Sequence, residues 1–246
     1  TQLITLSLIP LLLILLFTFY ENLENRKKRN CYAILTISFF AFIMYTAWYT
    51  AFFTALFSFI WFIIYIIINK KNQTDFVESF FHFLKQNLKD IFIYFLYMIV
   101  ILIPFIYLYI PVLRQSGERK WEEISGLLPE IIDFFNVTKN NWLFGDFFGK
   151  MQLEKRGFSS ELCEGFSLIF WLAFVMSFFI LRRMIGTIKE KKRKKEILFY
   201  SSIFYSIVVS MVLILKLSSN GLSLWMIIYK WIPGAGSIRA VVRYLF

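Results

Sequence analysis

Residues 31–68, CYAILTISFFAFIMYTAWYTAFFTALFSFIWFIIYIII, carry no formal charge over 38 positions. A single helix of this length, at about 1.5 Å per residue, would be nearly twice as long as the roughly 30 Å hydrocarbon core of a bilayer. Two shorter spans fit better, because the Tyr, Thr and Trp residues of YTAWYT at 45–50 suit a turn at the membrane–water interface. The stretch therefore predicts two membrane helices, at about 31–46 and 50–68.

The rest of the chain has the composition of a membrane protein. Of its 246 residues, 59% are hydrophobic and 21% are aromatic, more apolar surface than a soluble domain of this length can bury. Further apolar runs lie near 2–20, 91–110, 161–181 and 197–217, each close to the roughly 20 residues that cross a bilayer. We predict an all-α polytopic integral membrane protein with about six transmembrane helices.

The start of the chain and its cysteines set further expectations. The first apolar run follows Thr1 without a basic leader and ends without a small-residue cleavage site, which favours a span over a signal peptide. We expect a single transmembrane domain, 1–246, whose N-terminal part is missing. Cys31 and Cys163 fall on opposite sides of the predicted bilayer, which excludes a disulfide between them and gives no metal-binding spacing.

The basic residues predict the orientation of the spans. Residues 21–30, 69–90 and 182–196 hold 4, 4 and 8 Lys and Arg residues, 16 of the 27 in the chain. Because short loops rich in Lys and Arg stay in the cytoplasm, these three connections are predicted to be cytoplasmic. The predicted outward-facing segments are the turn at 45–50, the outer loop at 111–160 and the terminal motif at 218–246.

The net charge of +11 is therefore mainly a consequence of topology. Nucleic-acid binding would need basic residues interleaved with exposed aromatics on a folded domain, and the basic runs are short and lie beside the spans. We expect no nucleic-acid partner, and membrane lipids are the predicted surroundings. The chain has no phosphate-binding Walker loop, dinucleotide fingerprint, zinc signature or G-x-S-x-G motif.

The cytoplasmic segment DFVESFFHFLKQNLKD, residues 75–90, predicts a helix that lies in the membrane interface. The residues of its apolar face are Phe76, Phe80, Phe83 or Leu84, and Leu88. His82 is the only histidine of the chain. We interpret it as a surface or packing residue, because one imidazole cannot form a multi-histidine metal site.

The outer loop contains a second amphipathic pattern in GERKWEEISGLLPEIIDFFN, residues 117–136. Its apolar residues are Trp121, Ile124, Leu128, Ile131 and Phe135. This 3-4-3-4 spacing predicts one helix, kinked at Pro129, that lies on the membrane surface and covers a cavity. On the polar side, Arg119, Glu122 and Glu123 are candidates to point into a site; the alternative is an ordinary solvated face.

The chain closes on WIPGAGSIRAVVRYLF, residues 231–246. Its two glycines predict a tight turn, and Ser237 is placed to cap a helix that begins at Ile238. Arg239 and Arg243 then lie on one face of this helix. Backbone N–H groups at a helix N-terminus with nearby arginines bind phosphate well, which predicts a site for a lipid-linked phosphate. The alternative is that both arginines reach out to anionic lipid head groups.

Five segments together carry a resemblance to a known family: YTAWYTAFF, RQSGERKWEEISGLLPEIIDFF, NNWLFGDFF, ELCEGF and PGAGSIRAVVRYLF. Their order resembles the C-terminal half of bacterial polytopic glycosyltransferases of the GT-C superfamily, including relatives of the protein mannosyltransferases and of YfhO-type membrane proteins. The resemblance implies transfer of a sugar from a polyprenyl-phosphate carrier to an acceptor on the outer face of the bacterial inner membrane.

The resemblance also implies a catalytic Asp or Glu in an outer loop that would precede Thr1, so the catalytic residue stays unknown. Glycosyl transfer needs positive charge to hold the departing phosphate, and we expect Arg239 and Arg243 to supply it. Arg119 is a second contact, with Glu122 or Glu123 as groups that orient the acceptor. No cofactor is identified, and a divalent metal would have to be held by residues outside this chain.

Two other function classes stay open. A transporter would place polar or ionisable residues inside the spans, or would break helices at mid-membrane. The spans here hold almost no such residues, and Pro10 and Pro104 lie near their turns. A non-catalytic subunit of a larger membrane complex would keep the fold and the aromatic packing without an acidic centre.

Overall fold

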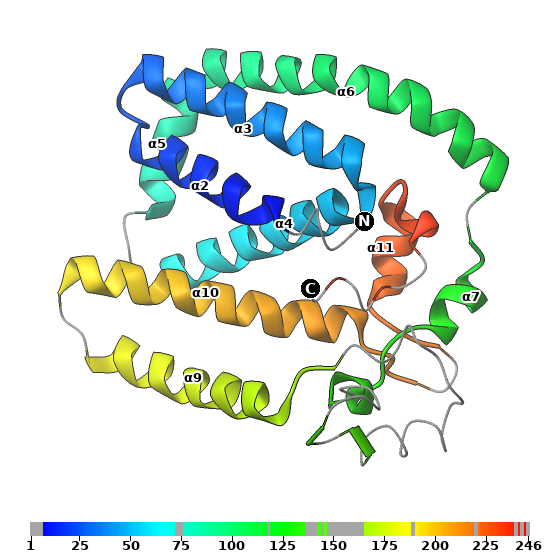
Figure 1. Cartoon of the computed structure of the whole chain (residues 1–246). Helices are drawn as coiled ribbons and strands as arrows, with labels where there is room; N and C mark the ends of the chain where they lie inside the picture. The colour runs from blue at the N-terminus through cyan, green and yellow to red at the C-terminus, as the bar shows by residue number, and fades with distance from the viewer. Residues whose placement is uncertain are drawn as a thin grey trace. The chain divides into compact units, whose positions relative to one another are not determined.

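The computed structural model describes residues 7–71, 76–117, 119–135, 142–143, 145–146, 165–187, 190–218, 221–238, 241 and 244. In this part of the chain all regular secondary structure is helical, which confirms the predicted all-α class (Figure 1). The α-helices are α2 (Leu8–Glu21), α3 (Arg26–Thr46), α4 (Trp48–Lys71), α5 (Phe76–Gln86), α6 (Leu88–Ser116), α7 (Trp121–Gly126), α9 (Leu168–Thr187), α10 (Lys191–Ile214) and α11 (Trp225–Trp231). The 3₁₀ helices η1 (Ile131–Phe135) and η3 (Ala235–Ser237) lie in the same part of the chain.

Four of the described helices contain segments long and apolar enough to cross a membrane: Trp48–Lys71, Leu88–Val112, Leu168–Thr187 and Arg193–Ile214. Their mean hydropathy lies between 2.0 and 2.6, and the chain itself buries none of the most apolar window of α6 or α9. Water-soluble proteins do not leave apolar surfaces of this size uncovered. These four helices indicate an integral membrane protein, and the six-span topology with its orientation stays a prediction.

The long uncharged stretch is broken into two helices, as the sequence predicts. The break is Ala47, whose extended backbone (φ −153°, ψ 89°) ends α3 within the expected 45–50 turn. Aromatic packing fixes this position, because the Trp48 ring lies 5.6 Å from Phe105 and 5.4 Å from Tyr109. The Tyr45 hydroxyl accepts from the Phe105 N–H at 3.1 Å and donates to the Ile101 carbonyl at 2.9 Å, which ties the end of α3 to α6.

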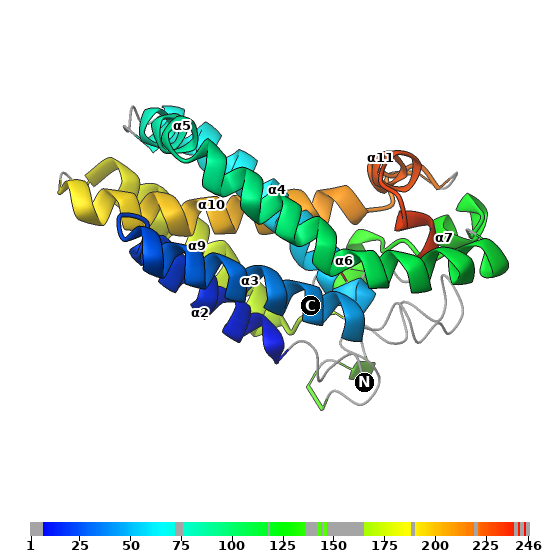
Figure 2. The same cartoon turned by 90° about the horizontal axis from the view of Figure 1, so that it is seen from above.

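The chain divides into two compact units, and we describe each by itself. Unit 1 comprises residues 1–59 and 69–116, and unit 2 comprises residues 60–68 and 117–246, so that α4 contributes to both. In unit 1, α3 packs against α2 and against α6 (Figure 2). In unit 2, α10 packs against α9, and Trp61 of α4 donates from Nε1 to Ser202 Oγ at 2.8 Å.

A buried ion cluster joins the first turns of α3 and α6 in unit 1. Asp90 accepts from Arg29 Nη2 at 2.6 Å and from Arg26 Nη2 at 2.8 Å. The side chains of Asp90 and Arg29 are each only 6% exposed, whereas that of Arg26 is 67% exposed. Arg29 also donates to the Leu23 carbonyl at 3.0 Å and lies over the Phe83 ring of α5, 5.6 Å from its centroid. Arg26 and Arg29 belong to the basic segment 21–30, which predicts the orientation of the spans. The contacts of these two arginines also join α3 to α6 and to α5.

The predicted interfacial helix is shorter than its apolar pattern suggests. α5 ends at Gln86, and Leu88, expected on its apolar face, is instead the first residue of α6 and is exposed. Phe80, Phe83 and Leu84 are half-buried as expected, and the side chain of Phe76 lies outside the described part. His82 is exposed and hydrogen-bonds to Gln86 at 2.8 Å, which fits a surface role.

Candidate functional site

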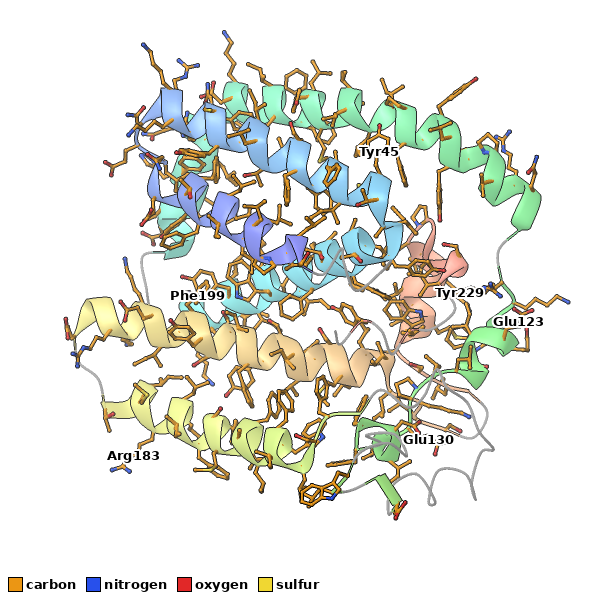
Figure 3. All side chains as sticks on the ribbon, in the orientation of Figure 1. Tyr45, Glu123, Glu130, Arg183, Phe199 and Tyr229 are labelled. Carbon is orange, nitrogen blue, oxygen red and sulfur yellow. The ribbon has the colours of Figure 1, made fainter. Side chains whose placement is uncertain are left out.

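The outer loop and the terminal motif, which the sequence singles out separately, fold together in unit 2. The Arg119 N–H donates to the Gly236 carbonyl at 3.0 Å, and the Tyr229 hydroxyl donates to the Arg119 carbonyl at 2.9 Å. The Trp121 ring packs 5.3 Å from the Tyr229 ring, and Figure 3 labels Tyr229 on α11 and Glu123 on α7. We refer to the described residues of 119–135 and 216–238 as the outer cap.

The outer cap has a dry core of its own. Five side chains are completely buried in or against it: Ile124, Leu128, Trp225, Ile238 and Val241. Gly221 adopts a left-handed backbone (φ +77°), and a Cβ at this position would lie 2.8 Å from Ser125 Cβ. The backbone at Gly221 and helix α7 therefore touch directly, and a side chain would separate them.

The prediction of a single helix over residues 117–136, kinked at Pro129, is wrong. α7 ends at Gly126, and η1 begins only at Ile131, because hydrogen bonds to other partners replace the helical ones around Pro129. The Pro129 carbonyl accepts the Lys216 N–H at 2.9 Å, and the Asp133 carboxylate accepts the Glu130 N–H at 2.7 Å. Pro129 itself has no N–H to continue the helix.

The break also divides the predicted apolar stripe. Ile124 and Leu128 are fully buried as expected, whereas Ile131 is 65% exposed because the 3₁₀ turn rotates it away from the core. Trp121 and Phe135 are half-buried.

The predicted charged residues of the loop face solvent. Arg119 Nη1 lies 3.4 Å from Glu123 Oε2, one helical turn away, and the two side chains are 42% and 57% exposed. Glu122 is exposed as well. Exposed pairs of this kind contribute little to stability, so neither side chain is committed to the fold. The geometry matches the solvated-face interpretation and leaves the Arg119 guanidinium accessible to a ligand.

The prediction that Ser237 caps a helix beginning at Ile238 is wrong. Gly234 takes the left-handed turn (φ +84°), and Ser237 belongs to η3, where its hydroxyl donates to the Gly234 carbonyl at 2.6 Å. The backbone is extended at Ile238, which ends η3 instead of starting a helix. The expected helix start at Ile238 is therefore not formed. Arg239 and Arg243 lie outside the described residues, and their role stays a prediction.

The end of the chain is anchored on α10. Tyr244 is buried, and its hydroxyl accepts from Ser210 Oγ at 3.0 Å. Burial raises the pKa of Tyr244 to about 12, so this hydroxyl stays neutral at physiological pH. The Tyr244 ring also lies 6.1 Å from that of Trp225 of α11, so Tyr244 contacts both α10 and the outer cap.

The two aspartates of the predicted outer loop differ in their surroundings. Asp133 is buried and serves as a cap for the Glu130 N–H, and Asp146 is exposed. Within the residues that the structure describes, no three His, Cys, Asp or Glu side chains are grouped to hold a metal. Cys31 is exposed, and Cys163 falls outside the described part.

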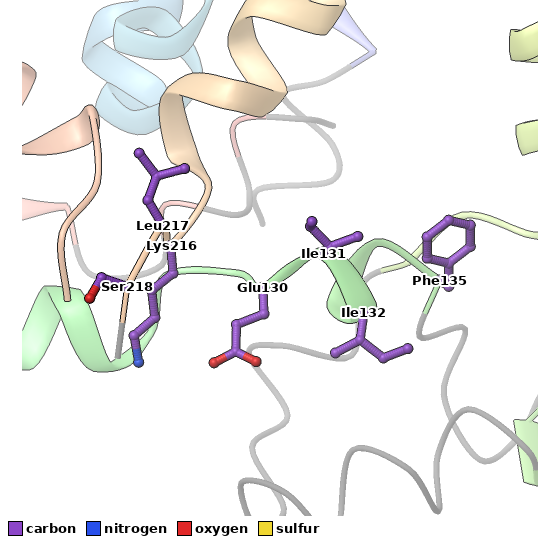
Figure 4. Close-up of a pocket in the computed structure, with 7 residues that line it drawn as sticks. All are labelled: Glu130, Ile131, Ile132, Phe135, Lys216, Leu217 and Ser218. Atoms are coloured by element: carbon purple, nitrogen blue, oxygen red, sulfur yellow. The ribbon is translucent and has the colours of Figure 1, made fainter. Parts of the chain in front are cut away.

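A pocket of about 470 Å³ opens between η1 and the segment that follows α10 (Figure 4). Its lining residues are Glu130, Ile131, Ile132 and Phe135 on one side, and Lys216, Leu217 and Ser218 on the other. The hydrogen bond from the Lys216 N–H to the Pro129 carbonyl joins the two sides. The sequence does not predict this pocket, because residues 130–135 and 216–218 are far apart in the chain. The one local signal for it is Lys216, a basic residue close after the apolar run of α10.

The pocket borders a cluster of aromatic residues. Trp171 of α9 donates from Nε1 to the Phe134 carbonyl at 3.0 Å, and its ring lies 5.1 Å from that of Phe135. The Phe166 N–H donates to the same Phe134 carbonyl at 3.0 Å. Aromatic clusters at the ends of transmembrane helices are typical of the membrane–water interface.

Comparisons with known proteins add no identification. The chain matches no protein-family model, and neither a curated protein nor a solved structure is similar enough to count as a match.

Proposed function

We propose that this chain is part of a glycosyltransferase-like membrane protein, which takes a sugar from a polyprenyl-phosphate carrier and transfers it to an acceptor on the outer face. One observation supports the proposal most: the Arg119 N–H donates to the carbonyl of Gly236 at 3.0 Å, and Gly236 precedes Arg239 by three residues. The loop arginine is thus attached to the segment that carries the predicted phosphate ligands.

The chemistry of this arrangement is the stabilisation of a leaving phosphate. When the bond between the sugar and the carrier phosphate breaks, negative charge builds up on the phosphate oxygens. Guanidinium groups neutralise such charge with two parallel hydrogen bonds, which an ammonium group does not reproduce. In the proposal, Arg239 and Arg243 bind the phosphate directly, and Arg119 approaches it from the outer cap.

The acidic residues beside Arg119 have a secondary role in this proposal. Glu123 lies 3.4 Å from the Arg119 guanidinium in an exposed pair, so a phosphate can compete for the arginine. Glu122 or Glu123 orients an acceptor hydroxyl by accepting its hydrogen bond. No base that activates the acceptor is assigned among the described residues.

The test is sugar transfer by the full-length protein in membrane vesicles. Arg239→Lys or Arg243→Lys should lower the transfer rate roughly tenfold to a thousandfold, which corresponds to about 1.4–4 kcal/mol of lost transition-state stabilisation. Arg119→Lys should have a smaller effect. Arg193→Lys is the matched control, because its exposed side chain lies at the predicted cytoplasmic end of α10. Transfer rates within about twofold of the unmodified protein for all four variants would refute the proposal.

A non-catalytic membrane subunit is the second candidate. The burial of Asp133 favours it, because this outward carboxylate is 1% exposed and caps a backbone N–H, and so cannot act as a base. A subunit would show no transfer when purified alone and would restore transfer when added to its catalytic partner. An enzyme would transfer sugar by itself.

A further inference from the structure

The pocket between η1 and residues 216–218 lies where a predicted transmembrane helix ends. The apolar segment of α10 stops at Ile214, and Lys216 follows two residues later. The aromatic cluster around Trp171 borders the same pocket through Phe135. The end of an apolar span and a cluster of aromatic rings both mark the level of the lipid head groups. A ligand at this depth has an apolar part and a polar part.

The lining of the pocket matches such an amphiphile. Ile131 and Leu217 are 65% and 50% exposed, so they offer uncovered apolar surface. Glu130 and Lys216, both half-buried, add one negative and one positive charge. At partly buried positions these charges act more strongly on a ligand than they would in bulk water.

The two opposite charges decide which head group fits. A net anion would be attracted to Lys216 and repelled by Glu130, whereas a zwitterion can satisfy both groups. A primary ammonium offers three N–H donors to a carboxylate, and a quaternary ammonium offers none. A carboxylate can accept several hydrogen bonds at once, so Glu130 retains capacity for a ligand beside its contacts within the protein.

The walls that carry these charges are held in place by backbone hydrogen bonds. The Lys216 N–H donates to the Pro129 carbonyl at 2.9 Å, and the Glu130 N–H donates to the buried Asp133 carboxylate at 2.7 Å. The two backbone positions are therefore fixed before a ligand arrives, which lowers the entropy cost of binding. A volume of about 470 Å³ lies within the range of small-molecule sites.

We propose that this pocket binds the head group of a zwitterionic phospholipid that carries a primary amine, of the phosphatidylethanolamine type. Lys216 contacts the phosphate, Glu130 accepts from the ammonium group, and the acyl chains leave along Ile131 and Leu217. The bound lipid ties the outer cap to the membrane surface. This inference is independent of the proposed sugar transfer.

The experiment measures which lipid the purified full chain retains after delipidation and reconstitution with one lipid class at a time, by native mass spectrometry. Phosphatidylethanolamine should be retained about fivefold more than phosphatidylcholine or phosphatidylglycerol. Lys216→Gln should lower the retention of phosphatidylethanolamine about fivefold. Glu130→Gln should remove its advantage over phosphatidylcholine and increase the retention of phosphatidylglycerol. Lys230→Gln is the matched control, because Lys230 is an exposed residue of α11 that does not line the pocket, and it should change nothing.

Both pocket variants replace a charged group by a neutral polar one of similar size, and thermal unfolding in detergent verifies that they fold. Equal retention of the three lipids by the unmodified chain would overturn the proposal. So would an ethanolamine preference that survives Glu130→Gln. Displacement of the retained lipid by a polyprenyl-phosphate sugar in stoichiometric amounts would also overturn it, and would assign the pocket to the donor.

Discussion

Gly221 provides a sharp test of the outer cap, because two separate features of the structure forbid a side chain there. Its backbone is left-handed (φ +77°), and a Cβ would come within 2.8 Å of Ser125 Cβ on α7. Gly221→Ala should therefore push α7 away from the terminal segment. Gly126→Ala is the matched control, since a Cβ at Gly126 meets nothing within 4 Å and its backbone is not left-handed.

The expected magnitude follows from these two costs. A left-handed conformation costs an alanine about 1–2 kcal/mol. Overpacking of a close contact costs about 1–3 kcal/mol more, reduced by whatever α7 can shift. Together they lower the free energy for opening the outer cap by about 2–4 kcal/mol, which is roughly a 30- to 1,000-fold increase in the population of the open cap.

Hydrogen exchange of the purified chain measures this opening directly. Two backbone N–H groups report on the opening of the outer cap. The Arg119 N–H is hydrogen-bonded to the Gly236 carbonyl, and the Leu217 N–H is hydrogen-bonded to the Leu222 carbonyl. In Gly221→Ala both should exchange faster by the factor given above, while Gly126→Ala leaves them unchanged or slightly slower. A second variant, Ser125→Gly in the Gly221→Ala background, removes the clash but not the backbone cost, and should recover part of the protection. Unchanged exchange in Gly221→Ala would refute the packing of α7 on the terminal segment.

Two further predictions concern buried groups. Asp90→Asn leaves the buried Arg29 guanidinium without its anionic partner and should destabilise unit 1 by about 3 kcal/mol or more in detergent unfolding. Arg26→Ala, at a largely exposed side chain, should have a much smaller effect, and equal unfolding midpoints for the two variants would argue against the cluster. Ile124→Asp places a charge in the dry core of the outer cap and should abolish folded yield in size-exclusion chromatography. Ile131→Asp, at an exposed position, should be tolerated. An equal loss of folded yield in the two variants would instead support the continuous helix that the spacing predicts.

Some features of the fold can be predicted from one segment of the sequence, and others depend on contacts between distant segments. The split at Ala47 is predictable, because the distance limit of a bilayer and the interfacial residues around it act along one segment. The long apolar helices follow from composition in the same way. The ion cluster is not predictable from spacing, because Asp90 meets Arg29 only after α3 and α6 have packed together.

The outer cap shows the opposite case, in which a local pattern misleads. The 3-4-3-4 spacing places Ile131 on a helical stripe. In the structure the Pro129 carbonyl instead accepts a hydrogen bond from the Lys216 N–H, and the Asp133 carboxylate accepts one from the Glu130 N–H. Ser237 likewise has the residue type of a helix cap, yet its hydroxyl donates to the Gly234 carbonyl within a 3₁₀ turn. Long-range hydrogen bonds and a tight turn override the local preference at both positions. The attachment of Arg119 to Gly236 is equally invisible in either segment alone.

The orientation of the outer cap is the central claim, since sugar transfer on the outer face requires the cap to lie outside. Labelling of intact cells with a membrane-impermeant thiol reagent tests it, using single cysteines in a background with Cys31 and Cys163 replaced by alanine. Trp142→Cys, at a 95% exposed position, and Lys230→Cys should label in intact cells. Lys27→Cys and Arg193→Cys should label only after the cells are permeabilised. Labelling of positions 27 and 193 in intact cells, with positions 142 and 230 protected, would contradict the account.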